Sequence, residues 1–157
     1  MKIKQWKVYL FWILLCESVG ALSGWLSREG IDIYEATVNK PVFTPPGWVF
    51  PVVWSVLFAL MGISAARIYL SEPSRNRNWG LNLFLIQLAV NFFWPLIFFN
   101  LQAFEIAFVW LILLWVLVAV VIRLFWKTDR TSAWLLVPYI VWLTFAVGLN
   151  VAIIIMI

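Results

Sequence analysis

The sequence contains no histidine and a single cysteine, Cys16. These two shortages exclude a histidine-dependent catalytic triad, a zinc centre, a disulfide within the chain and a haem held by histidine. Charged residues are also scarce: they make up 11% of the 157 residues, whereas hydrophobic residues make up 65%. A soluble domain of this size is about one quarter charged and about half apolar. The composition therefore predicts an integral membrane protein.

Five apolar segments are each near the roughly 20 residues needed to cross a bilayer. They cover about residues 6–26, 47–70, 79–99, 104–126 and 133–157, and the polar stretch 27–46 is the longest loop between them. A segment in hydrocarbon must satisfy its backbone hydrogen bonds internally, so each segment is expected to be a helix. The predicted fold is an all-α bundle of five transmembrane helices that forms a single domain over residues 1–157.

The first segment has an alternative interpretation. Lys2, Lys4 and Lys7 precede an apolar run, as they do in a cleaved signal peptide. The run continues to about Trp25, past signal length, and no small-x-small cleavage site is clear. We therefore expect a retained first transmembrane helix.

The positive charges alternate with the predicted crossings. Nine of the eleven Lys and Arg residues fall on the side of the N-terminus and of the second and fourth loops, and only Arg28 and Lys40 fall on the other side. The positive-inside rule then predicts a cytoplasmic N-terminus and an external C-terminus. The net charge of +4 forms no basic stripe outside these short loops, so the expected partner is the lipid bilayer and not a nucleic acid.

Residues 40–62 read KPVFTPPGWVFPVVWSVLFALMG, a proline-rich loop that turns into an apolar helix. Pro45 and Pro46 fix φ ahead of the helix, and Thr44 is a candidate N-cap. Pro51 is expected about one turn inside, where it would bend the helix. Aromatic residues come next at Trp48, Phe50, Trp54 and Phe58. This arrangement predicts either the rim of a ligand pocket or an ordinary helix start with interfacial tryptophans.

The twelve tryptophans include two contrasting sets. Trp6, Trp25, Trp79, Trp126 and Trp134 lie at segment ends. Such rings belong in the headgroup belt and need no functional explanation. Trp54, Trp94, Trp110, Trp115 and Trp142 lie deeper. A buried indole N–H usually finds a partner, which is either protein or ligand.

Polar residues interrupt the aromatic faces of three helices. The faces contain Trp54, Phe58 and Met61; Gln87, Asn91, Trp94 and Phe98; and Tyr139, Trp142, Ala146 and Asn150. Amides at this depth either bond between helices or line a cavity. We expect Asn150 to be structural and Asn91 to lie in a cavity. Glu17 is a candidate proton-relay or substrate-charge residue, or is capped by a neighbouring helix. Gly20 and Gly24 permit close helix packing, within one chain or between two copies.

Three motifs, in order, carry a family resemblance. They are residues 40–62 above, NFFWPLIFF at 91–99 and VPYIVWLTFAVGLN at 137–150. With these motifs the chain resembles, over essentially its whole length, the TspO/MBR family of bacterial tryptophan-rich sensory proteins and the mitochondrial translocator protein, or peripheral-type benzodiazepine receptor. The final LNVAIIIMI lacks the Tyr and basic residue of the cholesterol pattern of mitochondrial members. This departure favours a bacterial-type member in the cell (inner) membrane.

The resemblance implies a homodimer whose intramembrane cavity lies under the first loop as a lid. It implies porphyrin-type tetrapyrroles, isoquinoline-carboxamides and benzodiazepine-type compounds as ligands, with no cofactor required. Carried onto this chain, the ligand-binding residues are Tyr34, Pro45, Trp54, Phe58, Asn91, Trp94, Trp142, Phe145 and Ala146.

The resemblance is compatible with three functions. The first is a membrane receptor or sensor for tetrapyrroles, since a flat macrocycle suits an aromatic-lined slot. The second is a small transporter of such compounds, although five helices without an internal repeat give it weak support. The third is an enzyme that degrades porphyrin in light; the sequence has no acid–base pair or metal constellation for ordinary catalysis, so this ranks as a side activity.

Overall fold

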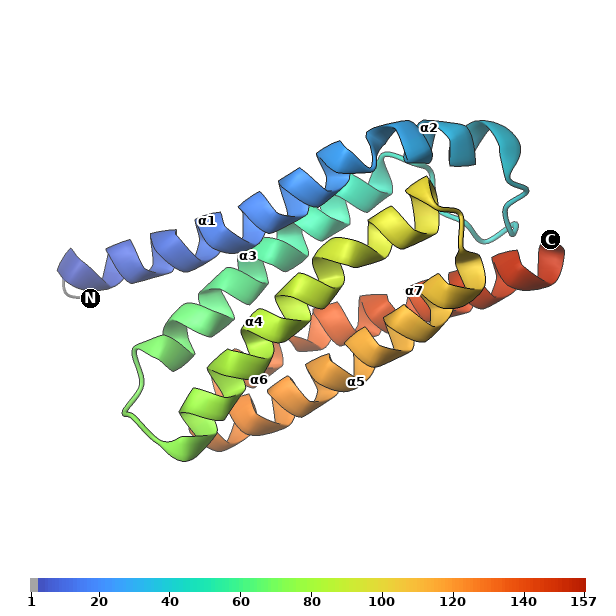
Figure 1. Cartoon of the computed structure of the whole chain (residues 1–157). Coiled ribbons are helices and arrows are strands. Elements are labelled where there is room, and N and C mark those ends of the chain that lie inside the picture. Colours follow the sequence, from blue (N-terminus) through green and yellow to red (C-terminus); the bar gives the residue numbers. More distant parts are fainter. Residues whose placement is uncertain (1–2) are drawn as a thin grey trace.

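The protein is a bundle of five long helices, as expected. The computed structural model describes residues 3–157, and all five long helices are apolar enough to cross a membrane. The elements are α1 (Ile3–Leu26), α2 (Arg28–Thr37), α3 (Val49–Tyr69), α4 (Arg75–Pro95), the π-helix η1 (Leu96–Asn100), α5 (Phe104–Thr128), α6 (Arg130–Leu135) and α7 (Val137–Met156). Within residues 3–157 there is no strand. Helix α1 begins at one end of the bundle and α7 finishes at the other end, as an odd number of crossings requires (Figure 1).

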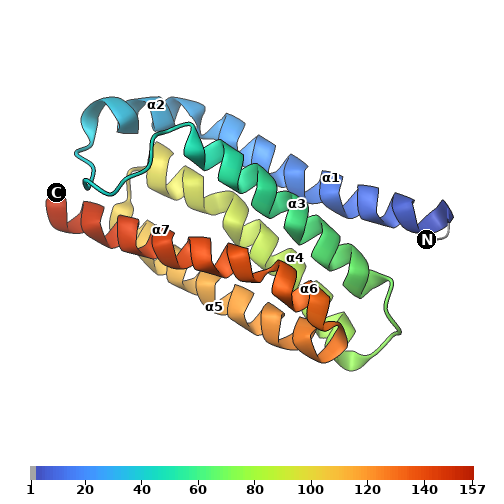
Figure 2. The ribbon, with the colours of Figure 1, turned by 180° about the vertical axis from the view of Figure 1, so that it is seen from behind.

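The helices pack in two groups that share α4. α1 packs chiefly on α3, and α4 and α7 both pack on α5. Seen from behind, α7 runs along the bundle next to α5 (Figure 2). Helix α6 continues into α7, so the two cover the fifth predicted segment together.

The first loop is not irregular, which corrects the prediction for residues 27–46. Its first part forms the ten-residue helix α2, which covers one end of the bundle (Figure 1). The helix is amphipathic and buries Gly30 and Tyr34. A Cβ at Gly30 would collide with the backbone of Phe99 and the side chain of Asn100, so only glycine lets α2 approach η1 this closely.

The start of α3 also differs from its prediction. The residue that precedes the helix is Trp48 and not Thr44, whose backbone N–H instead bonds the Pro41 carbonyl at 3.1 Å in a turn. Because the helix begins at Val49, Pro51 falls in its first turn, where no intrahelical hydrogen bond is lost. The expected cause of a bend at Pro51 is therefore absent. The helix that changes its geometry at a proline is α4, which widens into η1 directly after Pro95.

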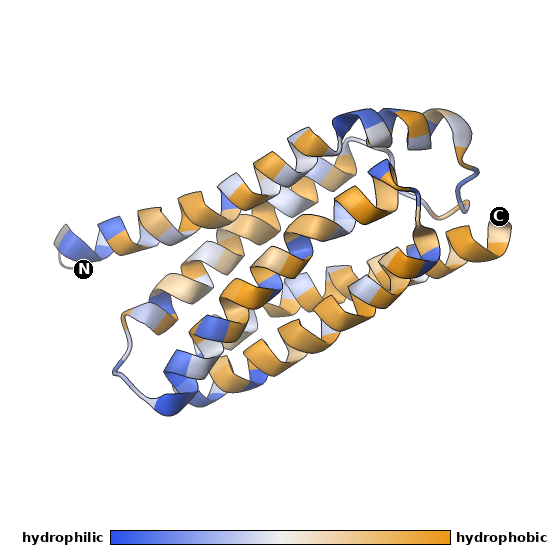
Figure 3. Ribbon diagram, in the orientation of Figure 1, coloured by the Kyte–Doolittle hydropathy of each residue, from blue (hydrophilic) through white to orange (hydrophobic). Residues whose placement is uncertain are grey.

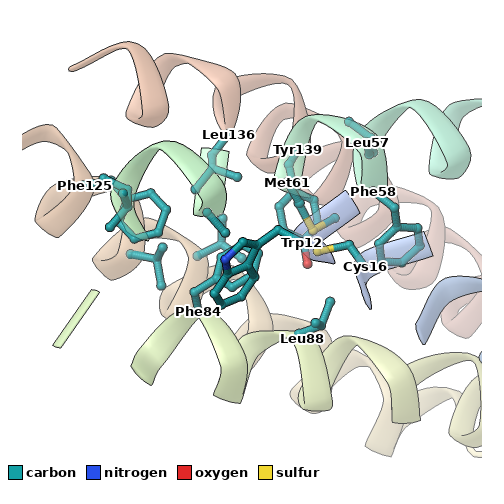
Figure 4. Close-up of a cluster of buried hydrophobic side chains, with 14 of the residues drawn as sticks. Trp12, Cys16, Leu57, Phe58, Met61, Phe84, Leu88, Phe125, Leu136 and Tyr139 are labelled. Atoms are coloured by element: carbon teal, nitrogen blue, oxygen red, sulfur yellow. The ribbon is translucent and has the colours of Figure 1, made fainter. Parts of the chain in front are cut away.

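The core lies between the helices, and the apolar outer surface faces lipid. Trp12, Cys16, Met61, Phe84 and Tyr139 form part of one buried cluster (Figure 4). Hydrophobic residues cover the middle of the bundle, whereas hydrophilic residues gather at the connections between helices (Figure 3). The five tryptophans predicted for the headgroup belt are all exposed on this surface.

An ion pair fastens the end of the bundle that is remote from α2. Arg67 Nε lies 2.8 Å from an oxygen of Asp129, which also accepts a hydrogen bond from the Ser132 hydroxyl at 2.6 Å. Burial opposes ionisation of this carboxyl, but the bonds from Arg67 and Ser132 outweigh burial and lower the pKa of Asp129 below its ordinary value. Asp129 therefore ties the end of α3 to the junction of α5 and α6.

Candidate ligand-binding cavity

A cavity of about 600 Å³ lies at the end of the bundle that α2 covers. Its walls come from α1, α3, α4 with η1, and α7, and Tyr34, Glu35, Thr44 and Gly47 contribute from the first loop. The lining is predominantly apolar. This size and composition are typical of sites that bind small organic molecules.

The structure brings together seven of the nine predicted ligand-binding residues. The seven that line the cavity are Tyr34, Trp54, Phe58, Asn91, Trp94, Trp142 and Ala146. Pro45 and Phe145 do not line it, although Thr44 and Gly47 on either side of Pro45 do. Phe145 instead supports Trp142, with ring centroids 5.3 Å apart. One residue along a helix turns the side chain by about 100°, which separates Phe145 from its neighbour Ala146.

The aromatic residues of the wall hold one another in place. Trp54 packs against Phe58 and Tyr139 with ring centroids 5.5 and 6.2 Å apart. Phe50, which is also on α3, meets the Trp142 ring of α7 edge-on, with ring centroids 5.7 Å apart. Such pairs add about 0.5–1.5 kcal/mol each beyond burial. The tryptophans from α3 and α7 are therefore positioned before any ligand arrives.

The deep tryptophans differ in what their indole N–H groups bond. The indoles of Trp94, Trp110 and Trp115 donate to the Ala107 carbonyl, the Val90 carbonyl and the Thr144 hydroxyl, at 3.1, 2.7 and 2.9 Å. Trp54 and Trp142 have no such acceptor within residues 3–157, and both line the cavity. The cavity therefore offers two indole donors to an occupant.

A line of polar side chains crosses the bundle behind the cavity. The amide nitrogen of Asn91 donates to the Tyr139 hydroxyl at 2.6 Å, and that hydroxyl donates to Gln87 Oε1 at 2.7 Å. The Gln87 amide nitrogen lies 4.0 Å from the Met61 sulfur. Asn91 is thus both a cavity residue, as expected, and a link between α4 and α7. Gln87 is structural.

Asn150 is only partly explained by the structural role expected for it. Its amide nitrogen donates to the Phe104 carbonyl at 3.0 Å, which joins α7 to the start of α5. Its oxygen is buried without a hydrogen-bond partner in the described part of the chain, and the residue lines the cavity. A buried acceptor without a donor is costly. Asn150 therefore adds to the site a hydrogen-bonding group that the spacing argument assigned to packing alone.

Helix α2 is held over the cavity by aromatic and polar contacts. Tyr34 packs against Phe98 and Phe99 of η1, with ring centroids 5.4 and 5.1 Å apart. Burial raises the pKa of the Tyr34 hydroxyl to about 12, so the group stays neutral even in alkaline solution. Lys40 Nζ lies 5.0 Å from the centre of the Tyr34 ring and donates to the Val38 carbonyl at 3.1 Å. Lys40 thereby holds the segment that follows α2 against the C-terminal part of that helix.

Of the two glycines of α1 singled out in the sequence, Gly20 serves helix packing within the chain and Gly24 does not. A Cβ at Gly20 would collide with the ring of Phe58, so this glycine lets α3 approach α1. Gly62 of α3 does the same from the other side, where a Cβ would meet the Ile13 backbone. Nothing lies within 4 Å of a Cβ placed on Gly24, which lines the cavity. The pair of glycines therefore has two different roles.

Glu17 is the one acidic residue of α1, and it lies in the cavity wall beside Ser55 of α3. The sequence left open whether a neighbouring helix caps it or whether it contacts a ligand. The Ser55 hydroxyl hydrogen-bonds the Glu17 carboxyl, so a neighbouring helix caps the group in part. Within residues 3–157 Glu17 has no ion-pair partner, and it lines the cavity.

Taken together, the fold and site define a helical membrane protein with an internal, aromatic-lined cavity beneath a helical lid. Comparison with known proteins narrows this class. The chain belongs to the TspO/MBR family, whose profile matches residues 12–156. It is 37% identical over 144 residues to Protein CrtK of Rhodobacter capsulatus. The matched region covers 91% of this chain and 88% of that protein.

Two further relatives come from other organisms. The chain is 35% identical over 137 residues to the tryptophan-rich protein TspO of Chlorobaculum tepidum, with 87% of each chain covered. It is 33% identical over 140 residues to the translocator protein of Homo sapiens, with 87% of this chain and 82% of the human protein covered. The family resemblance stated from the sequence is therefore confirmed.

Proposed function

We propose that this protein is a membrane receptor that binds tetrapyrroles and other flat, hydrophobic aromatic compounds in the cavity beneath α2. The observation that carries the proposal is the pair Trp54 and Trp142, whose rings line one cavity from two helices and whose indole N–H groups are unbonded in the described chain. A planar ligand between them gains stacking and burial, and it can accept a hydrogen bond from either indole.

The names of the relatives support a small-molecule role. One relative, from Cereibacter sphaeroides, is called a tryptophan-rich sensory protein, and it is 33% identical to this chain over 146 residues. The mammalian relatives are called translocator proteins. We infer that the present chain detects its ligand within the membrane, and that transport of the ligand is the competing function.

A spectroscopic titration of the purified protein with a panel of porphyrins tests the proposal. We expect saturable binding with one porphyrin per chain, accompanied by quenching of tryptophan fluorescence. An unrelated helical membrane protein in the same detergent controls for partition into micelles. Absence of saturation for every porphyrin would overturn the proposal.

Two further measurements separate the competing functions. Protein-dependent uptake of the bound porphyrin into sealed vesicles identifies a transporter. Loss of porphyrin absorbance in light but not in the dark identifies degradation. A receptor shows binding and neither of these activities.

A further inference from the structure

The charges that line the cavity are all of one sign. The ionisable residues in its wall are Glu17, Tyr34 and Glu35, and no lysine or arginine of the described chain lines it. Tyr34 is neutral at physiological pH, as an ordinary tyrosine already is, and burial raises its pKa further, to about 12. Glu35 is half-exposed and lies 3.8 Å from Lys40 Nζ. Within residues 3–157, the Glu17 carboxyl is therefore the one charge in this wall without a counter-ion.

The wall around Glu17 leaves room for a ligand group. Gly20, Ala21 and Gly24 lie beyond Glu17 along the same side of α1 and also line the cavity. None of them carries a side chain larger than a methyl group, and a Cβ at Gly24 would meet nothing within 4 Å. A ligand can therefore lie along α1 and reach the carboxyl.

Two amide oxygens of the wall can accept hydrogen bonds from the same ligand. The Asn150 oxygen is buried without a partner in the described chain, and the Asn91 amide nitrogen is already committed to Tyr139. Both amides can thus offer oxygen to the cavity. An ammonium or other cationic N–H group satisfies a carboxylate through a short, charge-assisted hydrogen bond, whereas a ligand carboxylate is repelled by it.

We propose that Glu17 recognises a cationic group of the ligand, so that the cavity selects basic aromatic compounds over acidic ones. The inference rests on the proposed function, because it assigns the ligand class of the same cavity. An acidic macrocycle is expected to enter with its carboxylates away from Glu17, towards the polar loop. The selectivity is a property of this carboxyl and not of the aromatic walls.

Matched ligands on one scaffold test the proposal. The probes are protoporphyrin IX as its free diacid, its neutral dimethyl ester and its bis(aminoethyl) amide, which is cationic. In the parent protein the amine should bind about tenfold or more tightly than the ester, the gain expected of a charge-assisted hydrogen bond. In Glu17→Gln this preference should vanish, the affinity for the ester should stay the same and that for the diacid should rise.

A matched control variant and a second scaffold make the test decisive. Glu72→Gln, on the connection between α3 and α4 and outside the cavity lining, should leave all three affinities unchanged. Equal binding of amine and ester by the parent, or a preference that survives in Glu17→Gln, overturns the inference. The pair 1-naphthylmethylamine and 1-naphthylmethanol asks the same question without a macrocycle. If no porphyrin binds but this pair shows the Glu17-dependent preference, the tetrapyrrole proposal fails and the inference stands.

Discussion

The amide nitrogen of Asn91 donates a hydrogen bond of 2.6 Å to the hydroxyl of Tyr139. This bond joins a residue of the cavity wall to one that is 1% exposed in the core. The same hydroxyl gives its own proton to Gln87, so a single oxygen holds two amides on α4 against α7. The orientation of Asn91 in the cavity is therefore set from the core side.

Tyr139→Phe should lower stability without altering the shape of the core. The change removes the partner of two amides, Asn91 and Gln87, in a dry environment, and each unsatisfied buried group costs about 1–3 kcal/mol. Thermal unfolding in detergent measures the effect. Tyr69→Phe is the matched control, because Tyr69 is half exposed and its hydroxyl makes no hydrogen bond within residues 3–157. Equal melting temperatures for the two variants would refute the role of the network.

Trp54→Ala and Trp142→Ala should each weaken porphyrin binding by about ten- to hundredfold. This range corresponds to about 1–3 kcal/mol for the loss of one stacking aromatic, by analogy with stacking on nucleic-acid bases. Fluorescence or absorbance titration gives the dissociation constants. Trp79→Ala and Trp134→Ala remove rings that are 57% and 62% exposed on the outer surface, and they should change affinity little. Unfolding temperatures of the same samples exclude a general loosening of the bundle. The opposite pattern, with loss only in the surface variants, would place the ligand on the lipid-facing surface.

Gly62→Ala and Gly148→Ala should have opposite effects. Both glycines lie within helices, where alanine is favoured by about 1 kcal/mol. A Cβ at Gly62 would run into the Ile13 backbone, which cannot yield without separating α1 from α3, whereas a Cβ at Gly148 meets nothing within 4 Å. We expect a lower melting temperature for the first variant and an unchanged or higher one for the second. A stable Gly62→Ala protein would mean that α1 and α3 are less closely packed than described.

Reporter fusions should reveal opposite sides of the membrane after Arg77 and after Ile157. The expectation rests on the nine-to-two division of Lys and Arg between the two sides, which places the N-terminus in the cytoplasm and the C-terminus outside. An alkaline phosphatase fusion is active only outside, and a fluorescent protein fusion serves as its cytoplasmic counterpart. If both positions report the same side, the number of crossings is wrong.

Most of the bundle could be predicted because long apolar runs leave helices as the only option in a bilayer. Helix α2 could not be predicted in this way, because a stretch of ten residues of mixed polarity is too short and too polar to cross a bilayer. Its stability comes from packing against η1. Spacing placed Trp54, Asn91 and Trp142 in one cavity. It also put Ala146, and not Phe145, on the face of α7 that holds Trp142, and the cavity lining agrees. Phe145 was included only because the family resemblance implied it. Spacing treated Asn150 as one unit, although its two amide atoms have different surroundings.

The position of α2 over the cavity depends on the number of residues in the π-helical turn that follows Pro95. A π-helical turn holds about one residue more than an α-helical turn, so η1 amounts to a single inserted residue within the α4 segment. Deleting that residue, for example Ile97, would let the helix run on as a regular α-helix and rotate the residues beyond the deletion by about 100°. Phe99 would then leave Gly30 and Tyr34, and Asn100 would lose the Leu26 carbonyl to which its amide donates at 2.9 Å. The number of residues in this turn, more than their identity, sets where η1 contacts α2 above the cavity.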